Sequence, residues 1–190
     1  MSQALPPEID PHLNLVAAHR ELLKHLHNLI RAGRLLVLGR GDLGLTLQIS
    51  KALRFLALDV PLHARDEEES LLPRLRAKLK DPQSHFSYLL EHIEKDHVEL
   101  AGLHVQFDAV ARKLVARIPF EGLAARKDLE PELKVFRGQA GELFNIYASH
   151  ILVEERDVFP ALAVIFTHTE REQIGREMTQ RRGLPVPAAV

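Results

Sequence analysis

Apolar residues recur along most of the chain at intervals of three and four, the spacing of one face of an α-helix. In the first segment these positions are Leu15, Leu22, Leu26, Leu29 and Ile30. Residues that interrupt helices divide the chain at GRGD (39–42), at Asp81-Pro82 and in the stretch 118–131. The pattern therefore predicts four long helices, over about residues 11–38, 43–80, 84–117 and 132–159.

The residues at the ends of these segments support the boundaries. Asp42 and Ser84 have the short polar side chains that cap helix N-termini, so they mark the starts of the second and third helices. Pro61 lies inside the second segment, and we expect it to kink that helix rather than end it. Pro160 is expected to disturb the end of the fourth helix.

A final short helix is predicted over about residues 169–182. Thr169 followed by Glu172 matches a capping box, and Gly183 can end the helix. Four long helices with short connections favour an all-α fold, an up-down-up-down four-helix bundle with an additional short C-terminal helix. One domain would cover residues 1–190, with its core over residues 11–166.

Composition and charge exclude several classes of protein. The 190 residues contain no cysteine, which excludes disulfides, thiolate metal sites, iron–sulfur ligation and thiol catalysis. The formal net charge of -1 gives no reason to expect a nucleic-acid or anionic-membrane partner. No run approaches the roughly 20 apolar residues that span a bilayer, and the first residues do not resemble a signal peptide. We therefore expect a cytoplasmic protein with no membrane partner.

Two segments of the chain repeat one motif. They are LHARDEEESLLPRL (residues 62–75) and SHILVEERDVFPAL (residues 149–162). Both read His-x-x-x-Glu-Glu, and in both a proline follows ten residues after the histidine. A single His-x-x-x-Glu pair is common on helix surfaces, but two copies with matched flanks favour a shared site.

The spacing within the motif has a physical meaning. Residues four apart lie on one face of a helix, about one turn from each other. His63 with Glu67, and His150 with Glu154, can therefore each offer a nitrogen and an oxygen to the same small volume. The following glutamates of the two motifs point about 100° away, so we expect them beside the site or on the surface; they are Glu68 and Glu155.

The distances between motifs along the chain add two candidate ligands. In an antiparallel helical hairpin, residues at the same level lie equally far from the turn. The midpoint between His19 and His63 is residue 41, inside GRGD, and that between the first motif and His97 is residue 81. The midpoint between His97 and the second motif is about residue 124, inside the third interruption. His19 and His97 are therefore at the right level to join both motifs.

Alternatives to these histidines exist among the eleven in the chain. His12 lies seven residues before His19, on a similar face of the helix, and is the alternative metal ligand on the first helix. His104 could be a hydrogen-bonded core residue, and the surface is expected to hold His25, His27, His85, His92 and His168. Glu94 and His97 match the Glu-x-x-His motif of ferritin-like di-iron bundles, but that architecture needs a second copy and the sequence has none.

The predicted metal ligands are His19, His63, Glu67, His97, His150 and Glu154. Six imidazole and carboxylate ligands are too many for one tetrahedral zinc and suit two six-coordinate ions such as iron or manganese. If both carboxylates and an oxide or hydroxide bridge the ions, about ten of roughly twelve coordination positions are filled. The open positions suit a small ligand, namely O₂, peroxide or nitric oxide.

The residues that carry this pattern resemble the hemerythrin-like (HHE) cation-binding domain family. The resemblance runs from HRELL (residues 19–23) through both motifs and covers most of the chain. It implies a four-helix bundle with a carboxylate-bridged pair of iron ions and a bridging oxide or hydroxide, with manganese or zinc as alternatives. Members of the family bind oxygen, sense oxygen or iron, or help repair nitrosatively damaged iron centres.

Ala101 separates this chain from the oxygen-carrying hemerythrins, which have a second histidine at that place, four residues after the third-helix ligand. The resemblance therefore favours a four-histidine, two-carboxylate centre and reactivity or metal exchange over pure oxygen transport. We predict a non-haem di-iron protein that acts as a sensor, a scavenger or an iron-centre repair factor. The alternatives are a metal-storage or metal-buffering bundle without redox activity and a bundle used only for protein contacts.

Overall fold

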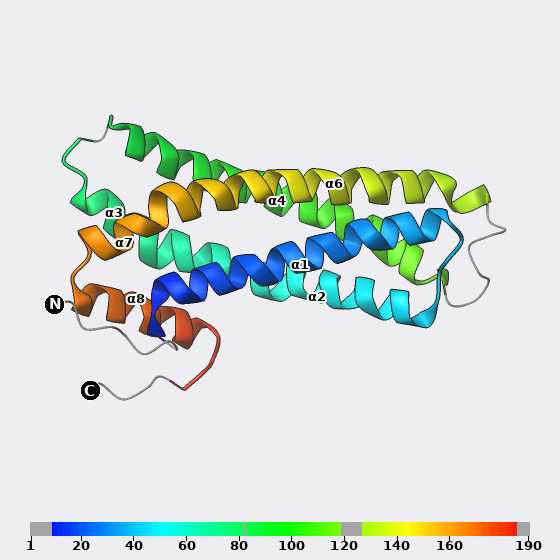
Figure 1. Ribbon diagram of the computed structural model, residues 1–190, viewed down its shortest axis with the longest axis horizontal. Helices are drawn as coiled ribbons and strands as arrows, with labels where there is room; N and C mark the ends of the chain where they lie inside the picture. Colours follow the sequence, from blue (N-terminus) through cyan, green and yellow to red (C-terminus); the bar gives the residue numbers. More distant parts are fainter. Residues whose placement is uncertain (1–8, 82, 119–126, 186–190) are drawn as a thin grey trace. The chain divides into compact units, whose positions relative to one another are not determined.

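The computed structural model describes residues 9–81, 83–118 and 127–185 and is helical in nearly all of them, with no strand among these residues (Figure 1). The all-α class is confirmed. In chain order the elements are α1 (Pro11–Val37), α2 (Leu43–Arg65), the π-helix η2 (Asp66–Leu71), α3 (Leu72–Lys78), α4 (His85–Val115), the 3-10 helix η4 (Lys127–Leu129), α6 (Glu130–Val153), the π-helix η5 (Glu154–Val158), α7 (Phe159–Ile165) and α8 (His168–Arg181).

The helices begin close to the predicted residues. The Asp42 carboxylate accepts a hydrogen bond from the Leu45 N–H at 2.7 Å and caps α2. At the start of α4, Ser84 Oγ accepts from the N–H of Ser87 at 3.3 Å. Pro61 lies inside α2 and does not end it. Pro82 and most of the predicted connection at 118–131 lie outside the described residues.

The predicted cap of the C-terminal helix was wrong by two residues. Thr167 caps α8: its Oγ1 accepts from the Glu170 N–H at 3.3 Å, and the Glu170 carboxylate accepts from the Thr167 N–H at 2.8 Å. The sequence contains Thr-x-x-Glu twice in overlapping registers, at 167–170 and at 169–172. The pattern alone does not separate the two registers, since both satisfy the capping-box spacing.

Contacts group the chain into two compact units. The first comprises Met1–Arg20, Pro61–Asp96 and Ser149–Val190, and the second comprises Glu21–Val60 and His97–Ala148. Across the described residues, none of the helices combines the length and hydropathy that a bilayer crossing requires. The cytoplasmic location stays a prediction.

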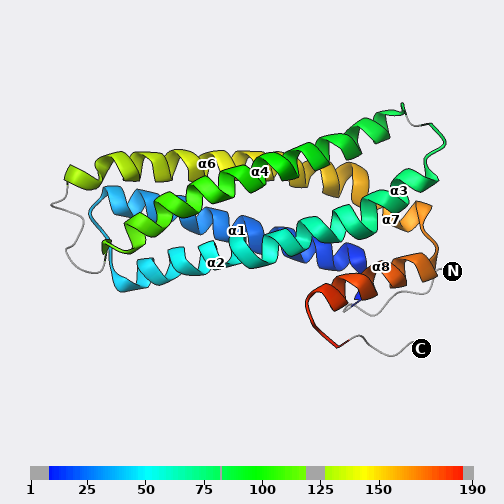
Figure 2. The same ribbon diagram turned by 180° about the vertical axis from the view of Figure 1, so that it is seen from behind.

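The first unit has a core to which all of its segments contribute. Its largest buried side chains include Leu15 of α1, Leu75 of α3 and Phe159 of α7, each 1% exposed or less. From α8, Ile174 and Met178 join this core. The first turns of α1 and helix α8 lie side by side in both views (Figure 1, Figure 2). The C-terminal helix is therefore an integral part of the first unit.

The second unit packs aromatic residues between its helices. Phe107 of α4 and Phe136 of α6 are fully buried, with ring centroids 5.1 Å apart. The same two helices also form a polar contact, in which the Tyr147 hydroxyl of α6 lies 2.9 Å from His104 Nε2 of α4. Burial lowers the pKa of His104 to about 4, so the neutral ring accepts the tyrosine's hydrogen bond. His104 is thus hydrogen-bonded, as the sequence suggested.

Candidate metal centre

Both His-Glu motifs adopt the same irregular helix. In each, the helix widens into a π-helix around the glutamate, over Asp66–Leu71 and Glu154–Val158. The N–H of Leu72 donates to the carbonyl of Glu67, and the N–H of Phe159 donates to the carbonyl of Glu154, five residues back in both cases.

The repeated proline of the motif disfavours a regular α-helix at the place where the helix widens. Pro73 and Pro160 come directly after the residues that close the π turns. Proline has no N–H, and its ring clashes with the carbonyl four residues back, so a regular α-helix cannot pass through either position without adjustment. π turns inside α-helices are rare and frequent at functional sites. The prolines are visible in the sequence, but no local pattern predicts the π-helices.

Four of the predicted ligands come together within the first unit. One ligand atom from each lies within 4.8 Å of the others, and the residues are His19, His63, Glu67 and Glu154. Their exposed fractions are 1%, 6%, 0% and 1%, so the whole group is shielded from water. His19 Nε2 is 3.0 Å from His63 Nε2, and His63 Nε2 is 3.3 Å from Glu67 Oε1.

Glu154 lies between two histidines and faces each with a different oxygen. Its Oε2 is 3.1 Å from His19 Nε2, and its Oε1 is 3.1 Å from His150 Nε2. His150 is 3% exposed and also has a ligand atom within 4.8 Å of atoms of Glu67 and Glu154. The first unit therefore brings together five of the six predicted ligands.

The sixth, His97, is half-buried on α4, directly after Asp96. It belongs to the second compact unit, whereas the other five belong to the first. Its place in the site stays a prediction.

The alternatives weighed from the sequence have other surroundings. His12 is exposed, and the edge of its ring meets Phe159, with centroids 6.2 Å apart. The same phenylalanine stacks on His19 at 5.3 Å and 17°, which covers one face of the buried imidazole. Arg76 binds both oxygens of Glu94, the glutamate of the ferritin-like reading. These contacts favour His19 over His12 as the metal ligand on α1. Glu94 pairs with Arg76.

Two carboxylates outside the cluster orient its histidines. His19 Nδ1 is 3.0 Å from Glu155 Oε1, and His150 Nδ1 is 3.1 Å from Asp96 Oδ2. An ionised carboxylate only accepts hydrogen bonds, so each Nδ1 carries the proton and each Nε2 is directed to the cluster. Glu155 lies beside the site, one of the two places expected from the sequence, whereas Asp96 was not among the predicted residues. The midpoint between Asp96 and His150 is residue 123, so the test that selected His97 also places Asp96 near the second motif. That test gives a level along the bundle and does not show which side chains form a hydrogen bond.

Residues 10–162 match the family model of the hemerythrin HHE cation binding domain. The match covers most of the chain and includes both His-Glu motifs. This chain belongs to the hemerythrin HHE cation-binding domain family. No curated protein and no solved structure matches it. The family match ends before α8 begins at His168.

In the buried cluster of this HHE domain, the histidines and carboxylates shift one another's pKa values. Burial lowers the pKa of His19, but the carboxylates of Glu154, Glu67 and Glu155 outweigh burial and raise that pKa above its ordinary value. Burial raises the pKa of Glu154, but His150 and His19 outweigh it and hold that pKa well below the usual range. The cluster therefore favours an ionised Glu154 with a positive charge beside it.

The donor set fits a metal cation. Glu67 and Glu154 are two carboxylates buried side by side, an arrangement that costs several kcal/mol, at the order-of-magnitude level, unless positive charge compensates it. Metal cations supply that charge, and their binding would displace the proton that the raised pKa of His19 favours. Imidazole nitrogen with carboxylate oxygen, and no sulfur, is a ligand set for iron, manganese or zinc.

Proposed function

We propose that this HHE domain is an up-down-up-down four-helix bundle that binds two iron ions and handles a small ligand such as O₂, peroxide or nitric oxide. The main support is Glu154, whose two oxygens each lie 3.1 Å from the Nε2 atom of a different histidine. A carboxylate placed in this way can bridge two cations, one beside each imidazole.

The proposed ligands are the six residues His19, His63, Glu67, His97, His150 and Glu154. Iron bound by nitrogen and oxygen donors supplies redox activity and open positions for a diatomic or peroxide ligand. Asp96 and Glu155 hold the rings of His150 and His19 with Nε2 directed inward. Phe159 covers one face of His19 and excludes water from that side.

Ala101 stands where the oxygen-carrying hemerythrins have a fifth histidine ligand, so it affects which activity we propose for the centre. It is exposed on α4 and has no side chain that could ligate a metal. A centre with four histidines leaves one ion with fewer nitrogen ligands than the five-histidine centre of the oxygen carriers. We therefore propose reaction with the small ligand, or exchange of metal, in the role of sensor, scavenger or repair factor, in place of reversible oxygen transport.

Elemental analysis of freshly purified protein, with an optical spectrum recorded in air, tests this proposal. We expect about two iron ions per chain and near-ultraviolet absorption from an oxo bridge. Replacement of His150 by Ala should lower the iron content. Replacement of His27 by Ala, an exposed histidine bonded to the Leu23 carbonyl, should not.

Other results would point elsewhere. Zinc at low occupancy, with no spectral response to oxygen, would favour metal storage or buffering. Absence of any metal would refute the site and favour a bundle used only for protein contacts. Reversible oxygenation over many cycles, without peroxide turnover, would contradict the role inferred from Ala101.

A further inference from the structure

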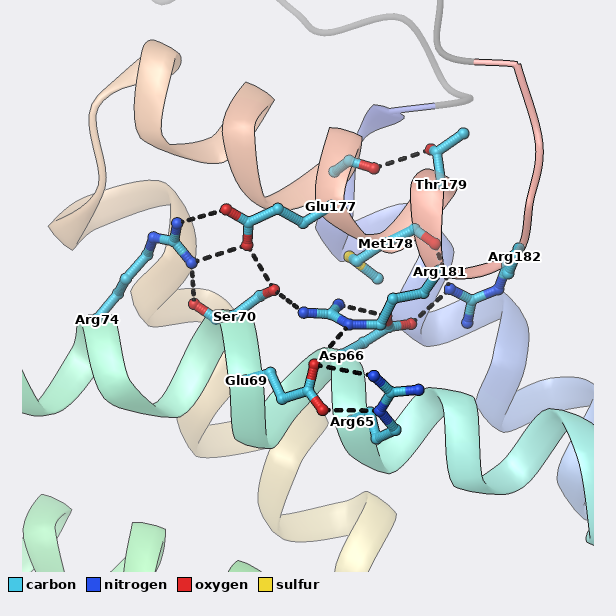
Figure 3. A network of polar contacts seen from close by, with 11 residues as sticks. Arg65, Asp66, Glu69, Ser70, Arg74, Glu177, Met178, Thr179, Arg181 and Arg182 are labelled. Atoms are coloured by element: carbon cyan, nitrogen blue, oxygen red, sulfur yellow. Dashed lines mark hydrogen bonds and ion pairs between the residues drawn. The ribbon is translucent and has the colours of Figure 1, made fainter.

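Helix α8 lies beyond the family match, yet it contacts the π-helix that contains Glu67. Its apolar face, with Ile174 and Met178, packs into the core of the first unit. Its polar side chains extend over η2, as Figure 3 shows. Because Glu67 is a proposed ligand, anything that fixes η2 also fixes one side of the metal site.

Arg181 at the end of α8 binds three residues of η2. Its Nη1 donates to Asp66 Oδ1 at 2.8 Å, its Nη2 to Ser70 Oγ at 2.5 Å and its Nε to Glu69 Oε2 at 3.0 Å (Figure 3). Asp66 is 1% exposed and Ser70 is fully buried, so two of these bonds are shielded from water. Arg182 adds an ion pair of 2.6 Å to the other oxygen of Asp66.

A second set of contacts starts one turn earlier on α8. Glu177 accepts from Ser70 Oγ at 2.6 Å and from Arg74 Nη2 at 2.7 Å. Arg74 also donates to the carbonyl of Ser70 at 2.7 Å, which places a charged group on the backbone of the π-helix. Both ends of η2 are therefore bonded to α8, directly or through Arg74.

The backbone of α8 approaches the start of the chain too closely for any residue but glycine. A Cβ atom on Gly175 would lie 1.8 Å from the carbonyl oxygen of Ile9, far inside van der Waals contact. Ile9 itself is buried. Gly175 therefore sets the distance at which α8 lies in the first unit, and a methyl group there would force the helix away.

These contacts bracket Glu67 in the chain. Asp66 precedes it, and Glu69 and Ser70 follow it within one turn, so all three bonds of Arg181 restrain the backbone around the ligand. π-helices are rare, and they occur mostly as single turns inside α-helices, often at functional sites. The arginine of the other π-helix, Arg156 of η5, pairs with its neighbour Asp157 within the same π-helix, whereas Arg181 reaches η2 from another helix.

We propose that Arg181 is a positioning residue for the metal centre, and that α8 holds Glu67 in place and thereby slows metal release. The bonds from Arg181 to Asp66, Glu69 and Ser70, with Gly175 against Ile9, are the contacts that do this. This inference rests on the proposed metal site, because it assigns α8 a role at one of its ligands.

The test compares three variants of the full chain with the wild type. Arg181→Gln removes the charge that binds η2, and Gly175→Ala displaces α8 without changing any charge. Arg176→Gln is the control, because Arg176 pairs with Glu172 one turn away on α8 itself. Each protein is loaded with ferrous iron without oxygen and diluted into excess chelator, and the rate of iron release is recorded.

We expect Arg181→Gln and Gly175→Ala to release iron about tenfold faster than the wild type, the size of effect usual for groups that support a ligand. The control should stay within about twofold of the wild type. Arg181→Lys, which keeps one charged donor, should restore part of the difference.

Hydrogen exchange of the metal-free proteins separates this role from a general loss of stability. Arg181→Gln should speed exchange at the amides of η2 and at Leu72, whose N–H closes the π turn on Glu67. Uniformly faster exchange across the first unit, or unchanged exchange at η2, would overturn the inference.

The two proposals can fail separately. A wild-type chain that takes up no iron refutes the proposed function, while exchange at η2 still tests the contact with α8. A wild type that takes up iron and releases it no more slowly than Arg181→Gln refutes the role of α8.

Discussion

Replacement of Asp96 by Asn should weaken metal binding through His150. The Asp96 carboxylate lies 3.1 Å from His150 Nδ1, and Asp96 is 9% exposed. Asn has the same size and can still accept a hydrogen bond, so the change removes the negative charge alone. Without that charge the imidazole becomes a poorer donor to a cation, because the carboxylate increases the basicity of Nε2.

The expected loss follows from the burial of the pair. A hydrogen bond to a charged group contributes about 1.5–3 kcal/mol where water does not compete. A neutral bond to Asn keeps about 0.5–1.5 kcal/mol of this, and about 1.4 kcal/mol corresponds to a tenfold change in affinity, so Asp96→Asn should weaken metal binding about five- to tenfold. Glu155 forms the matching bond to His19 at 3.0 Å, but its side chain is 40% exposed. Solvent screening limits that bond to about 1 kcal/mol or less, so Glu155→Gln should cost about fivefold at most.

The assay is metal competition against a chelator of known affinity, for the wild type and both variants. Denaturant unfolding of the three metal-free proteins serves as the control, because it separates loss of metal affinity from loss of fold. An effect of Glu155→Gln equal to or larger than that of Asp96→Asn would refute the argument from burial. Unchanged affinity in both variants would show that neither carboxylate supports metal binding through its histidine.

Three further predictions concern other residues. Glu154→Ala should lose most of its metal in elemental analysis, because both neighbouring histidines lose the carboxylate between them. Burial lowers the pKa of His104 from 6.5 to about 4, so stability should fall as pH drops from 6.5 towards 4, where only the unfolded state gains the proton. The loss is up to about 3 kcal/mol, and denaturant unfolding of His104→Leu should show it as a smaller dependence on pH. Phe136→Ala should lower the unfolding free energy by about 3–5 kcal/mol, since Phe136 is fully buried against Phe107.

Each of these has an outcome that contradicts it. Full metal content in Glu154→Ala would show that the ligand assignment at that position is wrong. The same pH dependence in His104→Leu and the wild type would mean that folding does not change the pKa of His104. A loss below about 1 kcal/mol in Phe136→Ala would mean that the second unit refills the space left by the ring.

The positions of the helices and a set of candidate ligands can be predicted from the sequence without its structure. Helical spacing of leucines, the caps Asp42 and Ser84 and the interruptions between segments are local properties, so they can be read along the chain. The repeated His-x-x-x-Glu spacing places two donors on one helix face whatever surrounds the helix, which is why Glu67 and Glu154 were identified as a pair.

Where two local patterns compete, the sequence gives no means of choosing. Thr167 and Thr169 both begin a Thr-x-x-Glu pattern, and the structure uses Thr167. The prolines of the two motifs were visible, but their consequence, a π turn at each glutamate, depends on how the helix is held on both sides of the proline.

The hydrogen bonds between distant residues beside the site became known only from the packing of the helices. Asp96 lies 54 positions from His150, and Arg181 lies 115 positions from Asp66, and no local pattern shows that either pair is hydrogen-bonded. Such contacts arise from the packing of separate segments, because side-chain direction is known only once each helix is placed against its neighbours. Local periodicity therefore fixes which face a residue occupies, and packing fixes what that face meets.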